Sequence, residues 1–221
     1  MMRGMKNQER STINSLEALQ EVFKGIPDYR VLGSILVAAI NGKPHREIHD
    51  IDLLIDEKNI KEVLARFEKL GFKRVQKHAP GFSWDEFEKP NYLTFTNLLK
   101  GSFKEGYFEY RINRWLSLRI NGDYLTATQY KLYGLPIKGI PKRSVFEGIK
   151  IASLNTKRKI DREVITGNFG SELPDGLSIN KAFKVKVFGL NIPYLYGIFS
   201  QIYNLIGGVR QKLGKPYDPW Q

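Results

Sequence analysis

Hydrophobic and polar residues alternate in blocks along the first third of the chain, and these blocks predict helices and strands in turn. Apolar residues at three- and four-residue steps are typical of amphipathic helices, whereas short apolar runs bounded by glycine or charged residues are typical of buried strands. The predicted elements are a helix over 11–23, a strand over 29–33, a helix over 35–42, a strand over 50–56 and a helix over 57–70.

The rest of the chain predicts several consecutive strands and then helices. Strands are expected over 73–77, 92–99, 107–113 and 115–120, a loop over 78–91, and one helix over 144–165 with Ser144 as its N-cap. Strands that first alternate with helices and then run together indicate an α+β fold, a mixed sheet flanked by helices. We expect one domain over 1–165, followed by a linker and a helical C-terminal extension over 166–221.

The longest uncharged stretch, from Val187 to Val209, has 23 residues. Its length alone would allow a membrane span, which takes about 20 mostly apolar residues. Polar residues dilute it, however, and its apolar residues recur at helical spacing. We therefore expect a packed helix or the face of a homodimer, and no membrane span. A helix lying on a membrane surface is the alternative.

The composition adds a strong basic excess, with 35 Lys and Arg against 23 Asp and Glu and a net charge of +12. This excess favours polyanionic partners such as nucleic acid or nucleotides, although a merely basic surface would give the same number. The absence of cysteine excludes disulfides, thiolate zinc sites and a Cys nucleophile, and fits a cytoplasmic protein. The first twenty residues lack the apolar core of a signal peptide.

Two carboxylates, Asp50 and Asp52, stand one residue apart at the start of the predicted strand 50–56. Because side chains alternate along a strand, both should point to one face and Ile51 to the other. Like charges at such spacing repel, and a divalent cation would offset this repulsion. Gly33 and Ser34 precede the helix before this strand, where backbone and hydroxyl donors can meet a phosphate.

This ordered set resembles the signature of the DNA-polymerase-β-like nucleotidyltransferase superfamily, and is similar to its aminoglycoside and lincosamide branch. That signature reads Gly-Gly or Gly-Ser, a helix, Gly-x-Pro-x-Arg and then Asp-x-Asp. The likeness covers about Arg30 to Glu57. Its positions are filled here by Gly33, Ser34, Gly42, Pro44, Arg46, Asp50 and Asp52.

The resemblance implies roles for these residues. Asp50 and Asp52 would hold Mg²⁺ or Mn²⁺, and Gly33 and Ser34 would bind the phosphates of a nucleoside triphosphate, with ATP as the expected donor. Arg46 and Lys150 would meet the triphosphate, the alternatives being a surface arginine and a solvated lysine. His49 precedes the acids and is not expected to be a ligand.

The family usually adds a third carboxylate from a later strand, as metal ligand or as base. Glu109, in a strand-like run, is the expected third acid, with an edge-strand surface residue as the alternative. The competing acids are Glu105, Asp123 and the three acids of the stretch WDEFE, Asp85, Glu86 and Glu88.

The implied activity moves a nucleoside monophosphate from a nucleoside triphosphate to a hydroxyl and releases pyrophosphate. The acceptor stays open between a small molecule, an RNA and a protein. The alternative is a non-catalytic nucleotide- or RNA-binding protein that retains the fold.

Overall fold

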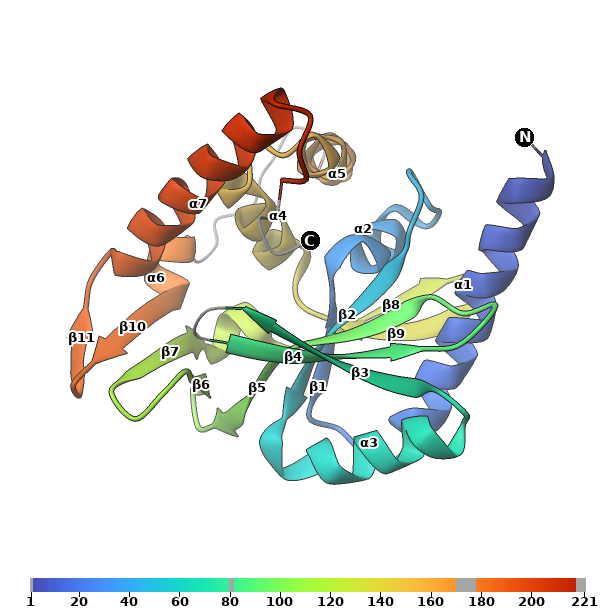
Figure 1. The fold of residues 1–221 in the computed structure, drawn as a ribbon, viewed down its shortest axis with the longest axis horizontal. Coiled ribbons are helices and arrows are strands. Elements are labelled where there is room, and N and C mark those ends of the chain that lie inside the picture. The colour runs from blue at the N-terminus through green and yellow to red at the C-terminus, as the bar shows by residue number, and fades with distance from the viewer. Residues whose placement is uncertain (1, 80–81, 170–177, 218–221) are drawn as a thin grey trace. The chain divides into compact units, whose positions relative to one another are not determined.

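The structure, a computed structural model, describes residues 2–79, 82–169 and 178–217. The chain forms two compact units (Figure 1). The first contains Met1–Phe103 and Ala127–Ile140, and the second contains Lys104–Thr126 and Pro141–Gln221. The domain boundary predicted after Ile165 falls inside the second unit, and part of the predicted linker lies outside the described residues.

The first unit carries the α+β pattern expected from the sequence. Its elements are α1 (Met2–Val22), β1 (Tyr29–Leu32), α2 (Gly33–Asn41), β2 (Asp50–Asp56), the short 3₁₀ helix η1 (Glu57–Asn59), α3 (Ile60–Lys69), β3 (Lys73–Ala79), β4 (Phe82–Glu88), β5 (Thr94–Lys104), β8 (Thr128–Leu132) and β9 (Leu135–Gly139).

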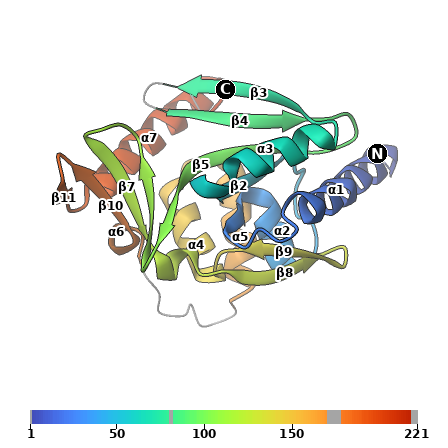
Figure 2. The ribbon, with the colours of Figure 1, turned by 90° about the horizontal axis from the view of Figure 1, so that it is seen from below.

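Its main sheet has the strand order β1-β2-β5-β4-β3. β2 and β5 run parallel, and the other neighbours run antiparallel, so the predicted mixed sheet is confirmed. β8 and β9 form a separate antiparallel hairpin that contacts α2, as Figure 2 shows. Neither strand is among those predicted from the sequence.

An aromatic cluster forms the core between α3 and one face of the sheet. Phe67 of α3 stacks on Phe87 of β4 at 4.4 Å between ring centroids and lies 4.9 Å from Phe95 of β5. Ile51 and Leu53 of β2 are fully buried on the same face. Burial of these side chains fixes the face of β2 that points inward, and therefore the face on which the alternate residues lie.

The loop predicted over 78–91 is wrong, because residues Phe82–Glu88 form β4. The segment looked loop-like because of its acids, yet one of them, Asp85, is fully buried. Arg74 Nε donates to Asp85 Oδ1 at 2.9 Å, and Lys100 forms an ion pair with Oδ2. Both cations come from neighbouring strands, so the compensation is invisible in the local sequence.

The second unit is built on an antiparallel sheet of order β6-β7-β10-β11. The helix predicted over 144–165 is two helices, because Asn155 starts a new one by accepting hydrogen bonds from Lys157 N and Arg158 N. Ser144 lies inside the first of them and is not its N-cap. The elements are β6 (Tyr107–Arg111), β7 (Leu116–Asn121), the short 3₁₀ helix η2 (Gly122–Leu125), α4 (Lys142–Ile151), α5 (Thr156–Gly167), α6 (Ile179–Ala182), β10 (Phe183–Val187), β11 (Leu190–Ile192) and α7 (Leu195–Lys212).

Helix α7 faces inward with its polar and glycine side. Of the two expectations for its apolar side, packing within the chain is not found, and a homodimer face stays a prediction. Asn204 is buried and accepts from Leu154 N at 3.0 Å and from the Tyr217 hydroxyl at 2.7 Å. A Cβ at Gly207 would lie 2.6 Å from the Tyr217 ring, so the helix packs closely there. The opposite side is 49–60% exposed and consists of Ile198, Phe199, Ile202, Leu205, Ile206 and Val209.

Crossing a bilayer takes a longer or more apolar helix than any found in the described ranges. Near the C-terminus, Tyr217 is buried.

The buried Asp85 should make stability depend on acid. Burial raises the pKa of Asp85, but hydrogen bonds and charges from Lys100 and Arg74 outweigh burial and hold this pKa below its usual value. Since the folded-state pKa is the lower one, the stabilisation is complete above the unfolded-state pKa and is lost as the pH falls below about 4. We expect Asp85→Asn to lower the free energy of unfolding at pH 7 by about 3 kcal/mol, because two cations lose a buried carboxylate.

Urea denaturation at pH 7 and pH 3 measures both effects, with Glu68→Gln on the exposed side of α3 as control. The wild type should lose more stability on acidification than Asp85→Asn does. Equal losses in the two proteins would contradict this assignment.

Candidate active site

Gly33 joins β1 to α2 and lies directly against the carboxylate of Asp52. Its φ of +72° is a left-handed conformation that favours glycine. A Cβ added there would collide with Oδ2 of Asp52 and lie 2.9 Å from its Cγ. The register explains the contact, because Leu32, the residue before Gly33, pairs with Asp52 across β1 and β2. A side chain at position 33 would therefore displace the second of the paired acids.

The N-terminus of α2 opens at the same point. The helix begins at Gly33, and the side chain of its N-cap residue, Leu32, makes no capping hydrogen bond. Ser34 is buried in its first turn. The first N–H groups of a helix have no partner within the helix, and together with the helix dipole they favour an anion. The first turn of α2 therefore lies next to Asp52, and phosphate binding by Gly33 and Ser34 stays a prediction.

Asp50 and Asp52 share a face of β2, as predicted. Both are partly exposed, whereas Ile51 and Leu53 between and after them are fully buried. The two acids therefore lie on the face opposite the aromatic core, where a ligand can reach them.

The parallel neighbour β5 places hydroxyl groups beside these acids. Thr94 pairs with Asp50, and Thr96 pairs with Asp52. Sequence reasoning did not single out either threonine, because nothing in the local pattern shows which strand will lie next to β2. β5 therefore supplies no acid directly beside Asp50 or Asp52.

Glu109, the expected third carboxylate, lies in β6 of the second unit. It accepts from Arg119 Nε at 3.0 Å and pairs with Lys104 Nζ at 3.3 Å. Burial raises the pKa of Glu109, but the hydrogen bonds from Arg119 and Lys104 outweigh burial and hold this pKa below its usual value. Its role with Asp50 and Asp52 stays a prediction.

Across the described residues, no three acidic or histidine side chains gather as a metal-binding group. Among the competing acids, Glu86 shares the row of Asp52, because Thr96 of β5 pairs with Glu86 on one side and with Asp52 on the other. Glu86 accepts from the Trp84 indole at 3.0 Å and lies 3.7 Å from Lys77 Nζ. It is the nearest acid to Asp52 by register on the far side of β5.

Mg²⁺ is commonly held by one or two carboxylates together with substrate phosphates and water. Asp50 and Asp52, beside the N-terminus of α2, fit this requirement with two carboxylates and a phosphate position. Mn²⁺ accepts the same oxygen ligands.

The remaining predicted contacts have these surroundings. Arg46 Nη1 donates to Glu47 O at 3.0 Å, and His49 Nε2 lies 3.7 Å from a Glu47 carboxylate oxygen. Lys150 lies in the last turn of α4, 3.6 Å from Glu147 and 5.5 Å from the Phe146 ring centroid. The phosphate-binding roles of Arg46 and Lys150 stay predictions.

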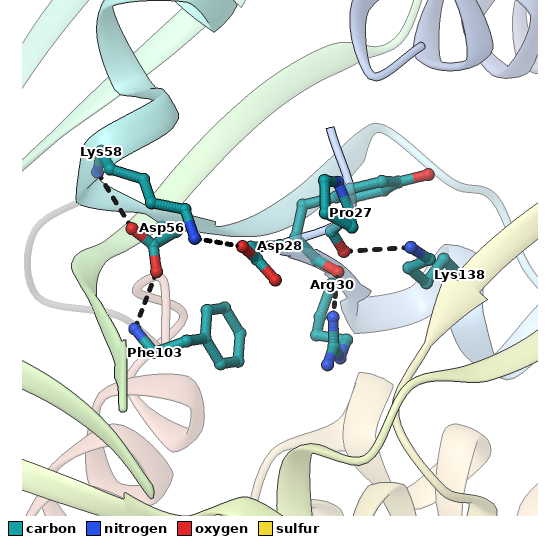
Figure 3. Close-up of polar contacts among 8 residues, drawn as sticks. Pro27, Asp28, Arg30, Asp56, Lys58, Phe103 and Lys138 are labelled. Atoms are coloured by element: carbon teal, nitrogen blue, oxygen red, sulfur yellow. Dashed lines mark hydrogen bonds and ion pairs between the residues drawn. The ribbon is translucent and has the colours of Figure 1, made fainter. Parts of the chain in front are cut away.

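A charged cluster at the other end of β1 was missed in the sequence (Figure 3). Lys58 pairs with Asp28 at 2.5 Å, and Lys138 Nζ donates to Pro27 O at 3.0 Å. Arg30 of β1 donates to Tyr29 O at 2.7 Å. Contact between β9 and β1 brings Lys138 to this cluster, although Lys138 lies more than 100 positions from Arg30 in the sequence.

At the level of sequence, no protein-family model and no curated protein matches the chain. Solved structures do match. The lincomycin-bound lincosamide antibiotic adenylyltransferase LnuA is similar with a TM-score of 0.59 and 18% identity, over 72% of this chain and 99% of that one.

The aminoglycoside nucleotidyltransferase ANT(2")-Ia, in complex with adenylyl-2"-tobramycin, matches with a TM-score of 0.53 and 13% identity over 72% of this chain and 91% of that one. A solution structure of ANT(2")-Ia matches with a TM-score of 0.53 and 12% identity. The chain therefore has the nucleotidyltransferase fold that the Gly-Ser and Asp-x-Asp residues predicted.

Gly33→Ala should be more costly than the matched change Gly25→Ala. Both glycines have positive φ, +72° and +77°, so alanine at either position costs about 1 kcal/mol of backbone strain. Nothing lies within 4 Å of a Cβ at Gly25, whereas a Cβ at Gly33 meets Asp52. Urea denaturation of both variants measures the difference, and equal losses of stability would show that the Gly33–Asp52 contact is not tight.

Proposed function

We propose that the protein is a metal-dependent nucleotidyltransferase. The observation that carries this proposal is the close packing of Gly33 against Asp52 at the N-terminus of α2. It places donors for phosphate beside two carboxylates on one face of β2, which is the combination needed to hold a nucleoside triphosphate with a divalent cation.

In this account the first turn of α2, with Ser34, holds the triphosphate, and Asp50 and Asp52 hold Mg²⁺ or Mn²⁺. The bound cation would neutralise charge on the phosphates and orient them. The acceptor hydroxyl oxygen forms a bond to the α-phosphorus, the bond to the β-phosphate oxygen breaks, and pyrophosphate leaves. Positioning and electrostatic stabilisation supply most of the rate in such transfers.

The hydroxyl proton needs a base, and Glu109 is our proposal for it. The carboxylate can accept a proton, although the hydrogen bonds from Arg119 and Lys104 that lower its pKa also make it a weaker base. Glu86, in the row of Asp52, is the second proposal for this role. Arg46 and Lys150 are proposed to contact the triphosphate.

ATP is the proposed donor, because the solved structures of similar fold include an adenylyltransferase and a complex with an adenylyl product. Those proteins act on antibiotics, whereas this chain has a net charge of +12, so the acceptor is proposed as a small molecule or an RNA. We place the activity in the cytoplasm, where ATP and Mg²⁺ are available.

One observation favours the alternative, a non-catalytic nucleotide- or RNA-binding protein. β5 sets Thr94 and Thr96 beside the paired acids, and the described residues hold no group of three metal-binding side chains. Such a protein would bind nucleotide but would not turn it over.

Transfer of label from α-³²P-ATP to total RNA and to an antibiotic panel tests the activity. Asp50→Asn and Asp52→Asn should each reduce transfer about a hundredfold or more, because each removes a carboxylate that would hold the cation against the phosphates. Glu68→Gln removes a carboxylate from the exposed side of α3 and should leave transfer unchanged. Glu109→Gln and Glu86→Gln then identify the base. Metal-dependent binding without transfer to any acceptor would favour the non-catalytic protein.

We also propose that α7 forms a homodimer. Its exposed residues Ile198, Ile202, Leu205 and Val209 follow steps of four, three and four, the spacing of a helix-pair seam. The seam is uncharged, and Arg210 and Lys212 lie at one end of the helix. In an antiparallel two-fold pair the cations of the two copies lie at opposite ends, which limits their repulsion.

Light scattering during size-exclusion chromatography tests the dimer. Ile202→Glu should convert dimer to monomer by placing a charge in an apolar contact. Gln201→Glu, which adds the same charge beside the seam, should leave most of the dimer intact. If the wild type is still monomeric at about 100 µM, which is about 100 times a micromolar Kd, this dimer is ruled out.

A further inference from the structure

The sheet of the second unit has one face that is covered by helices and one that is not. Residues directly opposite each other on neighbouring strands point to the same face, and Phe108, Ile120 and Phe183 form one such row across β6, β7 and β10. Phe108 and Ile120 are buried, and the Phe183 ring stacks on Tyr196 of α7 at 4.4 Å between centroids. The alternate residues of these strands therefore lie on the opposite face.

That opposite face is strongly basic. Two neighbouring rows on it consist of Arg111, Ser117 and Lys186, and of Glu109, Arg119 and Lys184. They hold four cations and one acid, and Glu109 is engaged by Arg119 at 3.0 Å and by Lys104 at 3.3 Å. The second unit as a whole has 17 Lys and Arg against 9 Asp and Glu, so it carries +8 of the chain's net charge of +12. Such a surface attracts polyanions.

An open cavity of about 290 Å³ lies at the end of this face, where β6 turns into β7. Its lining joins residues of the basic face to the turn, and includes Arg111, Arg114, Trp115, Ser117 and Lys186. The acid in the lining, Glu109, has its pKa lowered by Arg119 and Lys104, which belong to the sheet beside the cavity. The cavity is thus a basic hollow with an indole at its edge.

Two exposed aromatic rings stand together at this end of the sheet. Trp115 is 48% exposed and Phe188 is 69% exposed, and their ring centroids are 5.1 Å apart. Phe188 N donates to Trp115 O at 2.8 Å, which ties the turn between β10 and β11 to the start of β7. The Arg114 guanidinium lies 4.3 Å from the Trp115 ring centroid. Aromatic surface and positive charge therefore meet at one place.

The backbone at Phe188 is strained. Phe188 and Gly189 form the two-residue turn between the paired residues Val187 and Leu190, with φ of +48° and +86°. A turn with positive φ at both positions favours Asn or Gly at the first one, and a bulky side chain is disfavoured there. Since the ring is exposed, its burial does not offset this strain. Strained positions of this kind cluster at binding sites.

We propose that this face of the second unit binds single-stranded nucleic acid. Trp115 and Phe188 stack on bases, while Arg111, Arg114 and Lys186 bind phosphates. A basic groove with aromatic rings is how proteins hold single strands without reading their sequence, because every base has a π-face and every nucleotide a phosphate. The inference goes beyond the proposed transfer and does not depend on it, since none of these five residues has a role there.

Fluorescence anisotropy of a labelled oligouridylate of about ten nucleotides, titrated with the full chain without metal or ATP, tests the aromatic contacts. Trp115→Ala/Phe188→Ala should weaken binding about tenfold or more, whereas Trp115→Phe/Phe188→Tyr should keep most of the affinity. Tyr133→Ala is the matched control, because Tyr133 also has a positive φ, +53°, and precedes a glycine in the turn between β8 and β9. It should have no effect.

The dependence of binding on salt tests the cations. Arg111→Gln/Lys186→Gln should make the slope of log K against log salt shallower by about 1.4, since each phosphate contact on a single strand contributes about 0.7. Trp115→Ala/Phe188→Ala should leave this slope unchanged. Lys61→Gln/Lys69→Gln removes the same charge from α3 and should leave both slope and affinity unchanged.

Three outcomes would overturn the proposal. One is equal affinity in the wild type and Trp115→Ala/Phe188→Ala, and another is an equal loss in the Tyr133 or α3 control. The third is binding of polyglutamate as tight as that of the oligonucleotide, which would assign the face to an acidic protein. A DNA strand of the same length should bind like the RNA, and an RNA duplex should bind more weakly because its bases are already stacked; equal binding of the duplex would contradict base stacking.

Discussion

The contact between Gly33 and the Asp52 carboxylate is the constraint on which the candidate site depends. The chain turns from β1 into α2 at Gly33 with a φ of +72°, and the absence of a side chain lets the turn close onto β2. The same turn sets the first N–H groups of α2 beside the acid. One glycine therefore determines the positions of both the phosphate donors and the second carboxylate, and burial of Ile51 and Leu53 keeps that carboxylate on the accessible face.

The surface around the paired acids carries cations as well as carboxylates. The face with Asp50 and Asp52 also carries Arg30, and Lys138 lies beside it, so cations and acids occupy one surface.

The first unit was largely predictable from the sequence, because its signals are local. Alternation along β2 and helical spacing in α3 indicate which side chains are buried, and the structure buries Ile51 in β2 and Val63 and Phe67 on one side of α3. β4 was missed because Asp85 looks like a loop residue until Arg74 and Lys100 arrive from β3 and β5.

Long-range contacts also explain the other errors. The apolar pattern of α7 predicts a helix but not which side packs inward, since Asn204 is held by Leu154 and Tyr217 from other parts of the chain. Strand register likewise decides that Thr96, and no acid, stands beside Asp52. Such pairings depend on the assembled sheet and leave no mark in a local stretch of sequence.

A crystal structure with Mn²⁺ and a non-hydrolysable ATP analogue, with the anomalous signal of manganese recorded, tests the central claim most directly. The account predicts an anomalous peak between the carboxylates of Asp50 and Asp52, and phosphates at the first turn of α2. Manganese away from these two acids, or phosphates bound elsewhere, would contradict it.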